Sequence, residues 1–251
     1  MSKNIPLNER LIFALDVDSP SEANRWLDCL SEHVHFYKVG LQLFLAGGFP
    51  VIDMILGRGH QVMVDLKFFD IPETVALAVR KLRNKGATFI TVHGNEAILK
   101  AAVQERYESK ILAVTVLTSF DESDMLEMGL TGTIEDWVYH RAKKALSLGC
   151  DGIISSGIEV PRLREGFGDS FLIVTPGIRP GVNDVIQEDD QKRIVSAYQA
   201  IHHGADYVVI GRPIRHSKDP VSVVKQIQDQ IAKAIERREH GGGMTPAVGE
   251  K

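Results

Sequence analysis

Apolar residues recur along this chain in eight short runs, with longer stretches of helical periodicity between them. Short apolar runs that are bounded by polar residues or glycine are typical of strands buried on both faces. The intervening stretches place apolar residues on one helical face, as Val75, Val79 and Leu82 show, and so predict amphipathic helices. The expected strands cover residues 11–15, 36–39, 62–64, 89–92, 111–117, 152–154, 171–174 and 207–210.

The regular alternation of strand and helix predicts parallel βαβ units. Eight such units in 251 residues suit an α/β fold of the closed (β/α)8 TIM-barrel type. An open doubly wound sheet is the alternative, but no G-x-G-x-x-G pattern follows the first expected strand. We expect a single catalytic barrel domain over residues 1–238 and a disordered tail over residues 239–251, which contain three consecutive glycines.

Composition and charge narrow the class of protein. The chain is 44% hydrophobic and 25% charged, as globular proteins usually are. Its net charge of -4 and its lack of a basic tract argue against nucleic acid or an anionic membrane as the main partner. Its first residues lack the apolar core of a signal peptide, and no apolar run is long enough to span a membrane. Cys29 and Cys150 have no metal-ligand or redox spacing, so we expect a cytoplasmic protein without a metal site.

The most informative segment runs from Asp65 to Thr74 and has the sequence D-L-K-F-F-D-I-P-E-T. Side chains alternate along a strand, so Asp65 and Lys67 are expected on the same side of the strand that precedes them. Asp70 lies beyond that strand, and Pro72 suits the first turn of the next helix. A lone D-x-K could be a structural ion pair of little energetic weight. Three charges of alternating sign at a strand end instead favour a site for a charged substrate.

Polar side chains follow most of the other expected strands, where a barrel of this kind carries its active site. Asp16 follows the first strand, and Ser19 is the better candidate for the next helix cap because Pro and Glu follow it. Lys38 lies in an apolar strand and needs a partner, for which Asp65 on the neighbouring strand is the natural choice. His93 has no nucleophile motif beside it, so we interpret it as structural. The fifth and sixth strands lead into Thr118, Ser119, Ser155 and Ser156.

Glycine and arginine occur together after the last two expected strands. Gly177 and Arg179 follow the seventh strand, and Gly211 and Arg212 follow the eighth. In barrels these two loops often bind phosphate, because glycine exposes backbone N–H groups and arginine can donate two parallel hydrogen bonds. The glycines could instead serve only the turns. We interpret the pair of loops as the binding site for a phosphorylated small molecule.

From about Leu11 to Ile214 the chain resembles the orotidine 5'-phosphate decarboxylase family. The resemblance rests on the segment from Asp65 to Thr74 and on shorter motifs that occur in the family's order. These motifs are A-L-D at 14–16, K-V-G at 38–40, L-T-S at 117–119, P-G-I-R at 176–179, D-Q-K-R at 190–193 and I-G-R at 210–212.

The resemblance implies decarboxylation of orotidine 5'-monophosphate to UMP, in pyrimidine synthesis, without a metal or an organic cofactor. It implies a charged array of Asp65, Lys67, Asp70 and Lys38 in which Lys67 protonates the carbanion. It also implies a homodimer with shared active sites. The implied substrate contacts are Asp16 and Lys38 at the ribose, Ile71 and Thr74 from the partner together with Asp70, Thr118 in the nucleotide site, Ser156 at the pyrimidine, and Arg179, Gln191, Gly211 and Arg212 at the phosphate. Gln187 is the alternative to Gln191.

Two other functions fit parts of the pattern. A metal-dependent sugar-phosphate decarboxylase or aldolase of the same superfamily resembles this chain in D-x-K-x-x-D, but such relatives carry an acidic residue where this chain has Lys38. A non-catalytic nucleotide-binding barrel would keep Arg179 and Arg212 but would have no need of Lys67. The complete charged array therefore favours the nucleotide decarboxylase.

Overall fold

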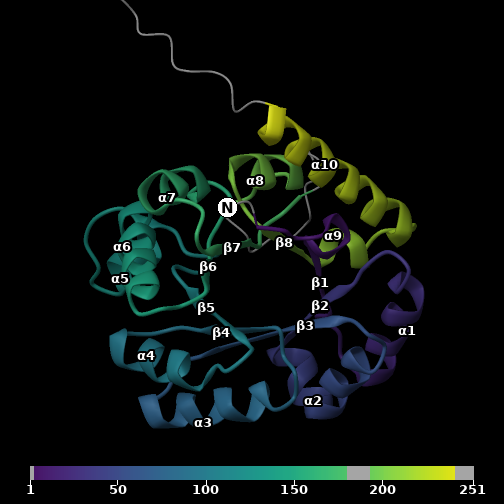
Figure 1. The fold of residues 1–251 in the computed structure, drawn as a ribbon, viewed down its shortest axis with the longest axis horizontal. Coiled ribbons are helices and arrows are strands. Elements are labelled where there is room, and N and C mark those ends of the chain that lie inside the picture. The colour runs from purple at the N-terminus through teal and green to yellow at the C-terminus, as the bar shows by residue number, and fades with distance from the viewer. Residues whose placement is uncertain (1–2, 180–192, 241–251) are drawn as a thin grey trace, which may run out of the picture.

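The computed structural model of the protein describes residues 3–179 and 193–240 (Figure 1). In this part of the chain eight parallel strands follow one another around a closed barrel, which β1 closes by pairing with both β2 and β8. The expected (β/α)8 TIM barrel is confirmed. The strands are β1 Leu11–Ala14, β2 Phe36–Gly40, β3 Gln61–Phe68, β4 Phe89–Val92, β5 Lys110–Val114, β6 Gly152–Ile154, β7 Leu172–Thr175 and β8 Tyr207–Ile210.

Helices surround the strands on the outside of the barrel (Figure 1). Ser19 caps α1 (Pro20–Leu30), since its hydroxyl accepts the N–H of Glu22 at 3.2 Å, so Asp16 is not the cap. Among the described residues the helices are η1 Leu7–Glu9, α1 Pro20–Leu30, α2 Leu41–Leu56, α3 Pro72–Arg83, α4 Glu96–Glu105, α5 Glu122–Glu127, α6 Ile134–Ser147, α7 Val160–Phe167, α8 Ala197–His203, α9 Arg212–Arg215 and α10 Pro220–His240. No helix within residues 3–179 and 193–240 is long and apolar enough to cross a membrane.

The strands lie close to their expected positions, with two differences at the mouth of the barrel. β3 continues to Phe68, because a register shift lets Phe68 pair with Val92 of β4. β5 ends at Val114 instead of continuing to residue 117, because its partner β6 ends at Ile154. Just beyond the end of β5, both the backbone N–H and the hydroxyl of Thr115 donate to the Ile154 carbonyl, at 3.4 and 2.8 Å.

The end of the described chain is more helical than expected. α10 continues to His240, so Glu239 and His240 belong to a helix and not to the expected tail. Residues 241–251 lie outside the described residues, and the division into a domain of residues 1–238 and a tail stays a prediction.

The core has two parts that follow from the alternation of side chains along the strands. One residue set points outward and packs against the helices, and the other fills the barrel. Phe36, Phe89 and Tyr207 pack together inside the barrel, with ring centroids 4.9 to 5.8 Å apart. Lys38 lies two positions after Phe36 on β2 and therefore on the same face of that strand. Asp65 lies two positions after Met63 on β3. The strands thus carry an apolar floor and place charged side chains above it.

Candidate active site

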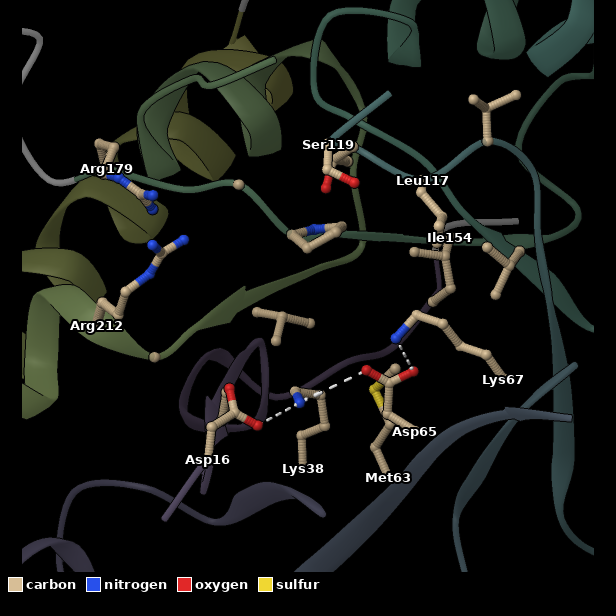
Figure 2. A pocket seen from close by; sticks show the side chains of 18 of the residues that line it. Asp16, Lys38, Met63, Asp65, Lys67, Leu117, Ser119, Ile154, Arg179 and Arg212 are labelled. Carbon is tan, nitrogen blue, oxygen red and sulfur yellow. Dashed lines mark hydrogen bonds and ion pairs between the residues drawn. The ribbon is translucent and has the colours of Figure 1, made fainter. Parts of the chain in front are cut away.

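A cavity of about 320 Å³ opens at the carboxyl ends of the strands (Figure 2). This is the end at which barrels of this type carry their active sites. Both charged and apolar side chains line it. The lining residues are Ala14, Asp16, Lys38, Met63, Asp65, Lys67, Val114, Val116, Leu117, Thr118, Ser119, Ile154, Pro176, Gly177, Arg179, Val209, Gly211, Arg212 and Arg215.

Four charged groups of alternating sign form a continuous row along one side of this cavity (Figure 2). The Lys38 ammonium donates to Asp16 Oδ1 at 2.9 Å and lies 3.5 Å from Asp65 Oδ2. The Lys67 ammonium donates to the other oxygen of that carboxylate, Asp65 Oδ1, at 2.9 Å. The sequence expectations that Asp65 and Lys67 share one side and that Lys38 pairs with Asp65 are confirmed. We call Asp16, Lys38, Asp65 and Lys67 the charged row.

The centre of the charged row is buried and its ends are open. The side chains of Lys38 and Asp65 are 10% and 11% exposed, whereas those of Asp16 and Lys67 are each 38% exposed. Burial acts to lower the pKa of Lys38, but the negative charges of Asp65 and Asp16 outweigh it and raise that pKa. Burial acts to raise the pKa of Asp65, but the positive charges of Lys38 and Lys67 outweigh it and lower that pKa. Both central groups are therefore ionised at neutral pH.

Arg179 and Arg212 lie at the opposite end of the cavity from Lys67. Figure 2 shows their guanidinium groups near one another, on the loops that follow β7 and β8. Gly177 has φ 75°, a conformation that suits glycine, so the backbone before Arg179 depends on this residue. A Cβ at Gly211 would lie 3.2 Å from Ala14 Cβ, so glycine allows this loop to approach β1 closely. The cavity therefore has a cationic end and, along its other side, the charged row.

Four of the expected site residues that the structure describes do not line the cavity, namely Ser156, Ile71, Thr74 and Asp70. Ser156 is completely buried outside it, where its hydroxyl accepts the Ile158 N–H and donates to the Arg193 carbonyl, both at 3.3 Å. Ile71 and Thr74 are exposed on the surface next to the barrel mouth. Thr118 and Ser119, from the loop after β5, occupy the wall instead of Ser156. The loop after β6 uses the Ser156 hydroxyl to hold its own backbone, which the sequence could not show.

Asp70 is also exposed and does not join the charged row of its own chain. Its carboxylate accepts the N–H of Ile71 at 2.6 Å, and it has no ion pair with Lys67 in the part of the chain that the structure describes. Gln187 and Gln191, the two candidates for the phosphate, lie outside the described residues.

Two arginines at the site were missed by the sequence reasoning. Arg215 lines the cavity and donates to the Asp16 carbonyl at 2.6 Å. Arg193 pairs with the buried Glu159 and donates to the Leu117 carbonyl at 2.7 Å. It thereby connects the start of the second described segment, at residue 193, to the loop after β5 that carries Thr118. Arg193 belongs to the D-Q-K-R motif, which pointed to a role for this residue. The neighbouring sequence did not indicate that its partners are Glu159 and the Leu117 carbonyl.

The contacts of His93 are those of a structural residue. Its ring packs against Phe69, with centroids 5.4 Å apart, and its Nδ1 lies 3.5 Å from an Arg141 nitrogen. Burial, with the charges of Arg141 and Lys67, lowers the pKa of His93 to about 4. The ring is thus neutral at neutral pH and can accept from Arg141. The described residues contain no group of three or more His, Cys, Asp and Glu side chains that could hold a metal ion.

Comparison with known proteins agrees with this geometry. The family model described as "Orotidine 5'-phosphate decarboxylase / HUMPS family" matches residues 9–227. A protein of Methylococcus capsulatus named orotidine 5'-phosphate decarboxylase is 48% identical, over 92% of this chain and 95% of its own length. One of the same name from Rhodopseudomonas palustris is 45% identical, over 90% and 96% of the two chains. The crystal structure of the Lactobacillus acidophilus decarboxylase matches with a TM-score of 0.78 and 34% identity, over 89% of this chain and 99% of that one. This chain belongs to the orotidine 5'-phosphate decarboxylase / HUMPS family.

Proposed function

We propose that this protein decarboxylates orotidine 5'-monophosphate to UMP. The observation that carries the proposal is the distribution of charge in the cavity. Arg179 and Arg212 form a cationic end that suits a phosphate, and the Asp65–Lys67 pair lies at the far end of the charged row (Figure 2). Asp16 and Lys38 lie between these ends, where the ribose hydroxyls of a nucleotide would reach them. The relatives named above carry the name of this activity.

The charged row supplies the chemistry that the reaction needs. When the bond between the ring carbon and the carboxyl group breaks, CO2 leaves and the electron pair stays on that carbon. A fixed ammonium beside the carbon stabilises this charge without reorganisation, and the Lys67 ammonium is held in place by Asp65 at 2.9 Å. Lys67 then gives its proton to the carbon, which forms UMP, and its amine takes a proton from solvent.

Asp65 also acts on the substrate before the bond breaks. A substrate carboxylate placed about 4 Å from the Asp65 carboxylate is repelled by on the order of 4 kcal/mol at an effective dielectric near 20. Loss of CO2 relieves this repulsion. Because the phosphate contacts lie at the other end of the cavity, their binding energy can offset the repulsion and so lower the barrier.

Lys38 distinguishes this proposal from a metal-dependent sugar-phosphate decarboxylase or aldolase. Two carboxylates facing each other would suit a divalent cation, but here the Lys38 ammonium lies between Asp16 and Asp65 and already supplies the positive charge. We expect turnover to be unaffected by EDTA. Loss of activity with EDTA, restored by added metal, would favour the metal-dependent function.

We further propose that the protein is a homodimer with shared active sites. Large apolar side chains are exposed on α2, on α3 and on the loop before α3, and we infer that they form the dimer interface, because exposed apolar patches mark protein interfaces. They are Leu41 at 59%, Leu45 at 82%, Phe69 at 69%, Ile71 at 66% and Leu77 at 45% exposed. Asp70 lies between Phe69 and Ile71 in the chain, and its carboxylate accepts the Ile71 N–H instead of pairing with Lys67 of its own chain. In a two-fold dimer Asp70, Ile71 and Thr74 can then enter the partner's cavity.

An absorbance assay with orotidine 5'-monophosphate tests the reaction directly. Lys67→Ala should abolish turnover and change UMP binding only modestly, because Lys67 lies far from the cationic end. Lys85→Ala is the matched control, since it removes an exposed lysine that pairs with Asp53 on the surface. Normal turnover by the Lys67 variant would show that Lys67 is not the proton donor. The expected cytoplasmic location stays a prediction, which cell fractionation can check.

Mixed dimers test the shared site. Lys67→Ala and Asp70→Ala should each be inactive alone. If both are unfolded and refolded together in equal amounts, about half the dimers are mixed, and about a quarter of all sites carry neither lesion. Activity should therefore return. If mixed dimers form and activity stays at zero, Asp70 does not serve the partner's site.

A further inference from the structure

Thr91 on β4 lies opposite the irregular part of β3. Val64 pairs with Ile90 and Phe68 pairs with Val92, so residues 65–67 of β3 all face the single residue Thr91. The side chain of Thr91 is completely buried, with 0% exposure. A bulge of this kind interrupts the backbone ladder, and the N–H groups of the bulged strand then need other acceptors.

The Thr91 hydroxyl takes the place of the missing ladder partner. It accepts a hydrogen bond from the Lys67 backbone N–H at 3.0 Å. The same hydroxyl donates to Asp65 Oδ1 at 2.9 Å, which is the oxygen that also accepts from the Lys67 ammonium. Thr91, Asp65 and Lys67 therefore form a closed ring of three hydrogen bonds, in which one hydroxyl contacts both members of the D-x-K pair.

The backbone of Lys67 needs such support. Its φ of 45° lies in the left-handed region, which side chains other than glycine adopt with strain. Strained backbone persists only where its surroundings hold it, and such residues cluster at active sites. The direction of the Lys67 side chain depends on the φ and ψ angles of this residue, so a change in them would move the ammonium relative to the Asp65 carboxylate.

We propose that Thr91 is a positioning residue for the decarboxylation, whose hydroxyl holds the Asp65 carboxylate and the Lys67 backbone so that the ammonium faces the reacting carbon. This inference rests on the proposed function. Thr91 does not line the cavity and acts on the substrate only through Asp65 and Lys67. Both hydrogen bonds require the hydroxyl, so serine should replace threonine and valine should not.

The first test compares Thr91→Val with Thr91→Ser in steady-state kinetics. Valine keeps the branched shape but lacks the hydroxyl, and we expect kcat to fall about 10-fold to 100-fold, the range for losing a hydrogen bond to a charged group. The KM should change far less than kcat, because the phosphate end of the cavity is untouched. Thr91→Ser should stay within about threefold of the parent kcat. The proposal is overturned if the valine variant keeps the parent kcat or if the serine variant loses as much.

Thr115→Val is the matched control for a buried hydroxyl at the barrel mouth. Thr115 is 1% exposed, and its hydroxyl donates to the Ile154 carbonyl without contacting the charged row. This variant should lose stability in thermal unfolding while its kcat stays close to that of the parent. An equal fall in kcat in the two valine variants would mean that Thr91 supports only the fold. If Thr91→Val does not fold, Thr91→Ala takes its place in the same comparison.

A second measurement does not depend on turnover. Amide hydrogen exchange of Lys67 should be faster in Thr91→Val than in the parent and unchanged in Thr91→Ser, because the hydroxyl is the acceptor of that N–H. Unchanged exchange in the valine variant overturns the positioning role whatever the activity is. If the parent protein does not convert orotidine 5'-monophosphate while exchange responds as expected, the proposed function fails and the support of Lys67 by Thr91 stands.

Discussion

Replacing Asp65 with asparagine should destabilise the protein far more than the same change at Asp16. Both carboxylates contact the Lys38 ammonium, but the Asp65 side chain is 11% exposed and the Asp16 side chain 38% exposed. Asp65 also accepts from Lys67 and Thr91. Asp65→Asn therefore leaves Lys38 buried with only one carboxylate and removes the charge that Lys67 faces.

The magnitude follows from the distances. At an effective dielectric near 20, the Coulomb attraction of Asp65 is about 6 kcal/mol to Lys67 at 2.9 Å and about 5 kcal/mol to Lys38 at 3.5 Å. The cost of desolvating the buried charges offsets much of this, and the 38% exposure of Lys67 screens its share. We expect a net loss of about 3 kcal/mol for Asp65→Asn, as for other broken buried pairs, and at most about 1 kcal/mol for Asp16→Asn.

Urea unfolding at a series of pH values measures both losses. The pKa of Asp65 is lowered in the folded protein, so its stabilising contribution is complete above the unfolded-state pKa near 3.9 and is lost as the pH falls through the lower folded pKa. The difference in unfolding free energy between the parent and Asp65→Asn should thus be constant from pH 7 to about pH 5 and shrink below about pH 4. Equal losses for the two variants, or a more stable Asp65→Asn protein, would refute the reasoning.

Three further changes give separate tests. Arg212→Ala should lower kcat/KM for orotidine 5'-monophosphate about 10-fold to 100-fold but leave turnover of orotidine, which lacks the phosphate, unchanged; equal losses would mean that Arg212 supports the fold. Glu159→Leu leaves the Arg193 guanidinium buried without its carboxylate and should cost about 3–5 kcal/mol in urea unfolding, with a smaller loss for Glu159→Gln. Gly152→Ala places a Cβ 2.4 Å from the Leu172 carbonyl oxygen and should cost about 1–3 kcal/mol, seen as a lower Tm; an unchanged Tm would show that β6 and β7 separate easily.

The sequence by itself determined the elements and much of the charged row. Strand positions followed from short apolar runs, and the shared side of Asp65 and Lys67 followed from the alternation of side chains. The cap at Ser19 followed from the residues after it. These features are local, since they depend on spacing within a few residues and on the geometry of a single strand or helix turn.

The tertiary structure decided which distant residues meet. The register shift between β3 and β4 places Thr91 opposite Lys67, where its hydroxyl accepts the Lys67 N–H. The two residues are far apart in the chain, and neither spacing nor composition predicts this contact. The fold of the loop after β6 buries Ser156, and the direction of the chain after β3 turns Asp70 outward. Such contacts depend on the pairing register and on the packing of whole loops. Because the free energy of these arrangements is shared among many residues of the barrel, no single motif in the sequence specifies them.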